Sequence, residues 1–422
     1  MTNTLNAPPK TDPAAPQDGV RPSALALFQR PFLQVWLLRA TAVLGSQIIA
    51  FALSLQLYQT SGSLLDLGLL GLVQFVPTVG FSLPAGQLTD RFPPGRMACV
   101  AQLLNATAAA MLLIACLAGA PSLTVLFAAA LMTGATRAFE HPVNTALLPL
   151  VVDREQLAAA VGWTASVAKM ATLGGPVLAG ALFALAPKAS YAVAAASCGG
   201  AAAIAFALPR PAARRVGHAI GFRSAFTGFS VLWRDRVLSG AMMLDLLAVL
   251  LGGATALLPA YALDVLHAGP VQLGLLRAAP GAGAVMLGVW LARHPVARHA
   301  GAVLVGTTLI FGVLTSLFGL SHNFALSLML LAAIGAADMV SIHIRSALVQ
   351  LRSPPELRGR VGAVNGIFIS SSNQIGAFES GLTASWFGLV PAIVAGGVAT
   401  ILATMFVAFV CSPLRTVDRP HD

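Results

Sequence analysis

The chain is poor in charge. Only 9% of its 422 residues are Asp, Glu, Lys or Arg, while 57% are hydrophobic and the mean hydropathy is +0.81. Soluble domains carry charge on about 25% of their residues, because charged side chains cover the surface. This scarcity excludes a soluble globular protein and predicts a chain that resides in a lipid bilayer.

Aromatic residues and cysteines are also scarce. With 7% aromatic residues, a cage of stacked rings around a large flat cation is less favoured than a cavity lined by small and basic side chains. The four cysteines have no metal-ligand spacing and lie within or at the end of apolar runs, at Cys99, Cys116, Cys198 and Cys411. We expect structural thiols and no bound metal.

Signatures of enzymes are absent as well. The sequence has no Gly-x-Ser-x-Gly, no His-Glu-x-x-His and no phosphate loop ending in Gly-Lys followed by Ser or Thr. We expect no enzymatic activity, no cofactor and no direct use of ATP as a source of energy. A membrane sensor or scaffold without transport activity is compatible with these absences and is kept as an alternative from another class of protein.

The chain does contain apolar runs, each close to the roughly 20 residues that a helix needs to cross a bilayer. We count twelve, at residues 33–58, 64–89, 97–118, 122–147, 158–184, 190–208, 238–262, 271–292, 300–320, 324–349, 361–386 and 391–411. The sequence therefore predicts an all-α membrane protein with twelve transmembrane helices.

The basic residues indicate the orientation of these helices. Most of the 25 Lys and Arg fall in the tails and the even-numbered loops, whereas Lys188 falls in an opposite loop. Because short loops rich in Lys and Arg stay in the cytoplasm, both termini are predicted to be cytoplasmic. The net charge of +10 is then a topology signal with an attraction to anionic lipid, and no nucleic-acid partner is expected.

The second half of the chain repeats the first. Gly134 and Gly335, Leu147 and Leu348, and Glu155 and Glu356 are each separated by the same offset, 335 − 134 = 201. A duplicated half predicts two six-helix bundles related by a pseudo-twofold axis, with a site between them. The expected organisation is a disordered cytoplasmic tail (1–30), an N-terminal half (31–209), a cytoplasmic linker (210–237), a C-terminal half (238–412) and a cytoplasmic tail (413–422).

Small residues and a proline are spaced along the fifth predicted span, at Gly162, Gly175, Pro176 and Gly180. Small residues on one helix face let a neighbouring backbone approach closely. The pattern resembles the antiporter motif of the major facilitator superfamily, although alanine replaces two of its glycines. This resemblance favours export over uptake.

A second pattern follows the second span. Gly86, Asp90 and Arg91 begin a sequence similar to a loop signature of the same superfamily, and Arg96 arrives two residues late. Such charges would cap helix ends and exchange partners as the halves rock, so we expect a gating loop, with a solvated turn as the alternative.

Further segments narrow the resemblance. The cytoplasmic loop residues Glu155, Glu356, Arg358 and Arg360 lie in sequences that, together with Pro259–Asp264 and Leu273–Gly283, resemble the enterobactin-exporter branch of drug:proton antiporters. The resemblance covers about residues 30–412. It implies the major facilitator fold and a monomeric, multi-pass transporter of the bacterial inner membrane, which exports a siderophore or drug-like molecule in exchange for protons by alternating access. Proton-coupled uptake of a small metabolite is the alternative.

Ionisable residues at membrane depth are costly, and they usually face a cavity. We expect the proton-coupling groups and the substrate cavity among ten such residues, whose basic members would suit a negatively charged siderophore: Arg39, Arg137, Glu140, Lys169, Asp245, Arg277, Asp338, His343, Arg345 and Glu379.

Glu140 is the first choice for the protonatable carboxylate. It lies three residues after Arg137, so both occupy one helix face and are expected to pair, with a permanent structural bridge as the alternative. Asp338 with His343 is the second choice. 

A further hypothesis concerns Arg39 and Asp245. They align at an offset of 245 − 39 = 206. Across the pseudo-twofold axis they would meet at the cavity and separate when it opens, with two separate snorkelling charges as the alternative.

Overall fold

The computed structural model describes residues 29–208, 233, 235–294, 299–353, 357–411 and 413–414. Most of the predicted N-terminal tail, most of the predicted linker 210–237, Glu356 and most of the C-terminal tail lie outside these ranges. Within them, regular structure is entirely helical, which confirms the predicted fold class.

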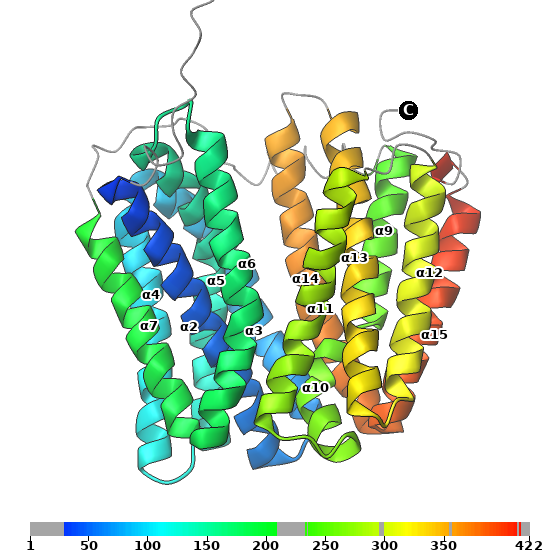
Figure 1. Cartoon of the computed structure of the whole chain (residues 1–422), viewed down its shortest axis with the longest axis horizontal. Coiled ribbons are helices and arrows are strands. Elements are labelled where there is room, and N and C mark those ends of the chain that lie inside the picture. The colour runs from blue at the N-terminus through cyan, green and yellow to red at the C-terminus, as the bar shows by residue number, and fades with distance from the viewer. Residues whose placement is uncertain are drawn as a thin grey trace, which may run out of the picture.

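Long helices form two bundles that stand side by side (Figure 1). The first bundle contains α2 (Arg30–Ser61), α3 (Leu64–Arg91), α4 (Pro94–Leu117), α5 (Leu123–Val151), α6 (Leu157–Leu185) and α7 (Pro187–Ala207). The second contains α9 (Arg236–Leu251), α10 (Leu258–Ala260), α11 (Pro270–Arg293), α12 (Ala300–Gly319), α13 (Phe324–Arg352), α14 (Arg358–Phe387) and α15 (Leu389–Val410). Among the described residues, 11 helical segments are long and apolar enough to cross a membrane, and α14, with the polar run 370–374, is long enough but less apolar.

The seventh span differs from the prediction of one helix over residues 238–262. The α-helix ends at Leu251, and Gly252 and Gly253 separate it from a 3₁₀ turn (Ala254–Leu257), from α10, and from a π-helical turn (Tyr261–Val265). A Cβ atom on Gly253 would lie 2.9 Å from the backbone oxygen of Gly376 in α14, so the break lets two backbones meet. The run of apolar residues continues across this break, which is why hydropathy does not reveal it.

The two ends of the molecule differ in charge. The connections after α3, α5, α11 and α13 carry Arg91, Arg96, Arg154, Arg293 and Arg352, and we call this the basic end. The other end, the turn end, carries short connections such as the one between α2 and α3. There Gly62 adopts a φ of 63° and donates its N–H to Tyr58, while Ser63 caps α3 by accepting from the N–H of Asp66.

Glycines show where the halves touch. A Cβ atom would lie 2.9 Å from the Cα of Gly381 if placed on Gly68, and 2.4 Å from the oxygen of Pro270 if placed on Gly180. These positions lie toward the turn end. Gly80, Gly162 and Gly366 lie toward the basic end of α3, α6 and α14, the helices that carry Gly68, Gly180 and Gly381. A Cβ atom on any of these three glycines would meet no atom within 4 Å. The halves are therefore closed at the turn end and separated toward the basic end, and we call the space between them the central groove.

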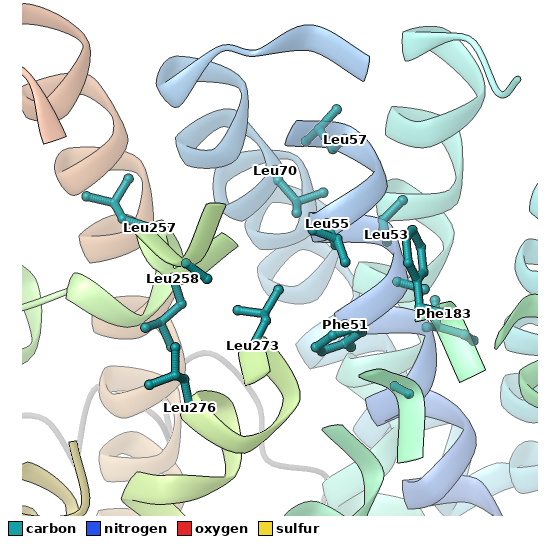
Figure 2. Close-up of a cluster of buried hydrophobic side chains, with 14 of the residues drawn as sticks. Phe51, Leu53, Leu55, Leu57, Leu70, Phe183, Leu257, Leu258, Leu273 and Leu276 are labelled. Atoms are coloured by element: carbon teal, nitrogen blue, oxygen red, sulfur yellow. The ribbon is translucent and has the colours of Figure 1, made fainter. Parts of the chain in front are cut away.

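A hydrophobic cluster seals the turn end. It joins α2 and α6 of the first half to the seventh span and α11 of the second half, and its side chains include Phe51, Phe183, Leu257 and Leu273 (Figure 2). All four are nearly inaccessible. The closed end is thus continuous packing between the halves, and opening it requires these side chains to separate.

Candidate functional site

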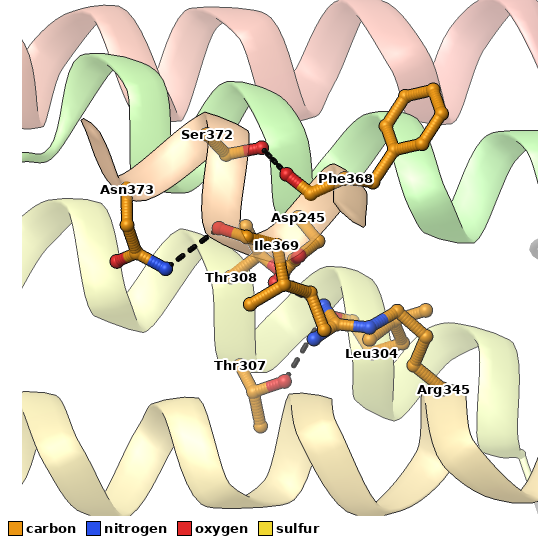
Figure 3. A network of polar contacts seen from close by, with 9 residues as sticks. All are labelled: Asp245, Leu304, Thr307, Thr308, Arg345, Phe368, Ile369, Ser372 and Asn373. Carbon is orange, nitrogen blue, oxygen red and sulfur yellow. Dashed lines mark hydrogen bonds and ion pairs between the residues drawn. The ribbon is translucent and has the colours of Figure 1, made fainter. Parts of the chain in front are cut away.

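A buried ion pair lies in the second half. Arg345 of α13 contacts the carboxylate of Asp245 in α9, and the two side chains are 3% and 9% exposed. Figure 3 shows this pair among Leu304 and Thr308 of α12 and Ile369 of α14. Removing one partner of such a pair leaves an uncompensated charge in an apolar surrounding, which costs about 3–5 kcal/mol.

Arg39 and Asp245, which are predicted to meet at the cavity and to separate when it opens, do not meet in this structure. Asp245 is neutralised inside its own half, and Arg39 lines a small cavity inside the other half, together with Gln102, Glu140 and Asn144. The reason is packing: α9 contacts α13 directly, whereas α2 packs mainly against α6 and α7 of its own bundle.

The two sites are nevertheless related by the repeat. Arg39 aligns with Asp245 at the offset of 206, and Asn144 aligns with Arg345, because 345 − 144 = 201. In each half, a charged group on the first helix therefore faces the fourth helix of the same half. The charges have opposite signs at the aligned positions, and the direct ion pair is formed in the second half.

The expected pair between Arg137 and Glu140 is wrong. Arg137 donates from Nη1 to the side-chain oxygen of Gln374 in α14 (2.7 Å), and Gln374 donates to the backbone oxygen of Gly71 (3.1 Å), in the amide orientation that satisfies all three groups. Among the side chains that the structure describes, the ion pairs are Arg345 with Asp245 and Arg352 with Asp235. Glu140 acts on Arg137 only through a longer-range attraction, because the arginine extends across the interface toward α14.

Arg277 also bridges the halves. Its Nη1 donates to the backbone oxygen of Ala50 in α2 (3.2 Å), and its Cζ lies 5.7 Å from the centre of the Phe51 ring. Arg137 and Arg277 are close enough to repel each other electrostatically. Two guanidinium groups, one from each half, thus lie within electrostatic range of each other at the closed interface.

The remaining predicted charges occupy different surroundings. Asp338 lies within electrostatic range of Asp245, Arg345 and Lys169, and Lys169 is exposed on α6 of the other half. Glu379 is half-buried on α14 and accepts a hydrogen bond from Thr383 (2.8 Å). His343 is exposed, and within the described part of the chain no hydrogen bond or ion pair joins it to Asp338.

The predicted antiporter-like residues lie along α6. Gly175 packs against Gln47 of α2, while Pro176 and Gly180 approach the backbone of α11 at Gly274 and Pro270. Gly162 lies nearer the basic end and contacts nothing within 4 Å. Pro176 and Gly180 are therefore part of the closed contact between the halves, whereas Gly175 packs within the first half.

The predicted gating and loop residues lie at the basic end. Gly86, Asp90 and Arg91 form the last turns of α3, and Arg96 lies in the first turn of α4, with Arg91 and Arg96 exposed. Glu155 is exposed in the turn before α6. The side chains of Asp90, Arg358 and Arg360 lie outside what the structure describes.

An ion pair that sequence reasoning missed also lies at the basic end. Asp235 caps α9 by accepting from the backbone N–H groups of Val237 and Leu238, and Arg352 of α13 donates to it at 2.8 Å. Burial alone would raise the pKa of the Asp235 carboxyl, but the hydrogen bonds and the charge of Arg352 together hold this pKa below its ordinary value. An Asp directly before the apolar run of a predicted helix is a common N-cap, and this pattern in the sequence could have indicated the role of Asp235.

A second missed contact crosses the turn end. The hydroxyl of Tyr58 in α2 donates a hydrogen bond to the carboxylate of Asp264 in the π-helical turn. These residues are aligned by the repeat, because 264 − 58 = 206, the offset that also relates Arg39 to Asp245. The repeat offset was the signal that could have suggested a meeting at the pseudo-twofold axis.

Two membrane-spanning six-helix halves, closed together at one end and separated at the other, with charged side chains between them, define a membrane transporter with a site between internal repeats. The chain belongs to the Major Facilitator Superfamily, whose profile matches residues 35–378. Its family and structural neighbours are transporters rather than enzymes.

Relatives of known function are exporters. The chain is 22% identical over 367 residues to the macrolide efflux protein A of Streptococcus pyogenes, a match that covers 85% of this chain and 90% of that protein. It is 24% identical over 391 residues to the enterobactin exporter EntS of Shigella dysenteriae, covering 91% of this chain and 92% of the exporter.

Solved structures share the fold. A bacterial homologue of the human lysosomal transporter Spinster, in an inward-facing and occupied conformation, matches with a TM-score of 0.69 and 14% identity over 92% of this chain and 97% of that one. A bacterial homologue of the iron transporter ferroportin, in an inward-facing state, matches with a TM-score of 0.65 and 18% identity over 92% and 99% of the two chains.

Proposed function

We propose that this transporter exports a small organic molecule across the bacterial inner membrane in exchange for protons. The observation that carries the proposal is the interface between the halves, which is closed at the turn end and open toward the basic end, with ionisable groups beside the groove. The efflux relatives support export as the direction. The alternative of a sensor or scaffold has no counterpart among these relatives.

The orientation follows from the charge of the basic end. If this end faces the cytoplasm, as its arginines favour, both termini are cytoplasmic and the groove opens inward. The structure then corresponds to the state that collects an outgoing substrate, and alternating access would open the turn end to the outside. The protein would act as a monomer, because the groove lies within one chain.

Asp338 would be the side chain that binds and releases the exchanged proton. Asp245 and Asp338 are near each other, and Arg345 already pairs with Asp245, so two carboxylates share one arginine in a largely buried setting. A proton on Asp338 removes this repulsion. Loss of the proton leaves a carboxylate attracted to Lys169 across the groove, so protonation changes the attraction between the halves. 

Glu140, the first choice from the sequence, becomes the second candidate. It lines the small cavity with Arg39, and within the described residues it has no ion-pair partner.

Inverted membrane vesicles that contain a pH-sensitive dye would test the proposal. After energisation, addition of an exported compound from a panel of siderophores and lipophilic drugs should release part of the proton gradient with the wild type. Asp338→Asn should abolish this release, whereas Lys188→Gln, at the start of α7, should leave it unchanged. A release that persists in Asp338→Asn but is lost in Glu140→Gln would assign proton coupling to Glu140, in the first half, instead of Asp338.

Uptake is the competing direction. The lumen of an inverted vesicle corresponds to the outside of the cell. An importer would therefore use the gradient to move its substrate out of the lumen of these vesicles. Radiolabelled substrate that enters inverted vesicles with the gradient supports export, and substrate that enters only right-side-out vesicles contradicts it.

A further inference from the structure

We propose that Arg137 and Arg277 form a binding subsite for the carboxylate of an organic anion, at the closed end of the central groove. This inference rests on the proposed function and narrows its substrate class to molecules with an anionic, planar oxygen group. The two arginines come from opposite halves, on α5 and α11, so the bound group would touch both halves at once.

The balance of charge singles out these two arginines. Of the other arginines and lysines at membrane depth, Arg345 is neutralised by Asp245, Lys169 has Asp338 within electrostatic range, and Arg39 shares a small cavity with Glu140. The contacts of Arg137 and Arg277 are instead with neutral oxygen atoms, those of Gln374 and Ala50. Both therefore carry their charge into the interface without a carboxylate in contact.

Two like charges without an opposite charge in contact are expected to bind a counter-ion when they lie inside a membrane protein. Charged side chains at membrane depth are usually paired, because an isolated charge is costly to bury. Arg137 and Arg277 repel each other, and Glu140 attracts Arg137 only from beyond ion-pair distance. An anion between the guanidinium groups would remove the repulsion and supply the missing acceptors.

The subsite can be reached from the groove. Arg137 is exposed although it lies in the middle of α5, and its contact with α14 shows that it points into the interface between the halves. Arg277 is half-buried, and its Cζ lies over the Phe51 ring, 5.7 Å from the ring centre, a position in which the ring attracts the cation. A guanidinium group presents parallel N–H donors that match the two oxygens of a carboxylate, so the geometry favours carboxylates over neutral amides of the same shape.

Benzoate and benzamide are a matched pair of probes, because they differ in charge but hardly in shape. With the purified full-length protein in detergent at constant ionic strength, benzoate should raise the thermal unfolding midpoint in a saturable way, and benzamide should not. Arg137→Gln and Arg277→Gln should each weaken benzoate binding by about tenfold or more, since a charged hydrogen bond is lost. Lys188→Gln should bind benzoate like the wild type.

A second variant covers the case in which an arginine substitution prevents folding. Gln374→Glu places a carboxylate beside Arg137 while both arginines remain, so it should compete with benzoate and weaken its binding by a similar factor. Equal stabilisation by benzoate and benzamide, or unchanged benzoate binding in Gln374→Glu, would overturn the proposal.

This experiment uses no proton gradient and is therefore independent of the transport test. Proton-coupled export by a protein that does not distinguish benzoate from benzamide would contradict the anion subsite alone. Benzoate binding that depends on both arginines, in a protein that moves no protons with any substrate, would contradict the proposed exchange alone.

Discussion

At the scale of single residues, the stability of the second half depends on the buried ion pair of Arg345 and Asp245. Asp245→Asn or Arg345→Met alone should destabilise the protein by about 3–5 kcal/mol, because each leaves one charge without its partner. The double variant should recover much of this loss, since neither charge then remains. Unfolding in detergent, followed by circular dichroism, measures the four stabilities, and additive losses in the double variant would show that the pair is not coupled.

The pair of Asp235 and Arg352 leads to a pH-dependent prediction. The folded-state pKa of Asp235 lies below its unfolded value, so its stabilising effect is present above the unfolded value, near pH 4, and is lost as the pH falls through the folded value. Asp235→Asn keeps a capping residue but removes the charge. The stability difference between wild type and Asp235→Asn should be about 0.5–1 kcal/mol at neutral pH and vanish in acid. A difference that is constant with pH would contradict the assignment.

At the scale of elements, the contact between Tyr58 of α2 and Asp264 of the π-helical turn holds the turn end closed. Tyr58→Phe should open this end more often, because a hydrogen bond to a charged group contributes about 1.5–3 kcal/mol. Ala260 is fully buried and belongs to the same small cluster as Tyr58. In a variant without the native cysteines, Ala260→Cys should react with a maleimide about tenfold faster when Tyr58→Phe is present.

Tyr191→Phe is the matched control for that experiment. Tyr191 is also buried and its hydroxyl donates a hydrogen bond to the backbone oxygen of Ala52, but both residues belong to the first half. Its replacement should not change the labelling rate of the cysteine at position 260. Similar acceleration by both replacements would indicate general loosening rather than opening of the interface.

The elements also show what the sequence was able to predict. Long apolar runs are a local signal and the repeat is visible in the sequence itself, so the fold class and most of the helices were predicted correctly, although the break in the seventh span was not. The partners of the buried charges were not, because Asp245 and Arg345 are separated by 345 − 245 = 100 residues and Arg137 and Gln374 by 374 − 137 = 237. Which side chains meet at such separations depends on helix rotation and packing, and periodicity does not determine either with sufficient precision.

At the scale of the whole molecule, the central claim is that protonation changes which end of the interface is closed. The turn end is held by glycine contacts such as Gly68 with Gly381, and the basic end stands apart around Gly80 and Gly366. Because the two halves are repeats of one another, closing the basic end would require the turn end to separate.

The most direct test is a pair of distance measurements by electron paramagnetic resonance, in nanodiscs. One spin-label pair would be attached at Val79 and Asn373, two exposed positions on α3 and α14, and the other at Gln59 and His267 near the turn end. On acidification, and in Asp338→Asn at neutral pH, the first distance should lengthen while the second shortens, because loss of the charge on Asp338 removes its attraction to Lys169 across the groove. Distances that stay unchanged in both conditions, or that lengthen together, would contradict the account.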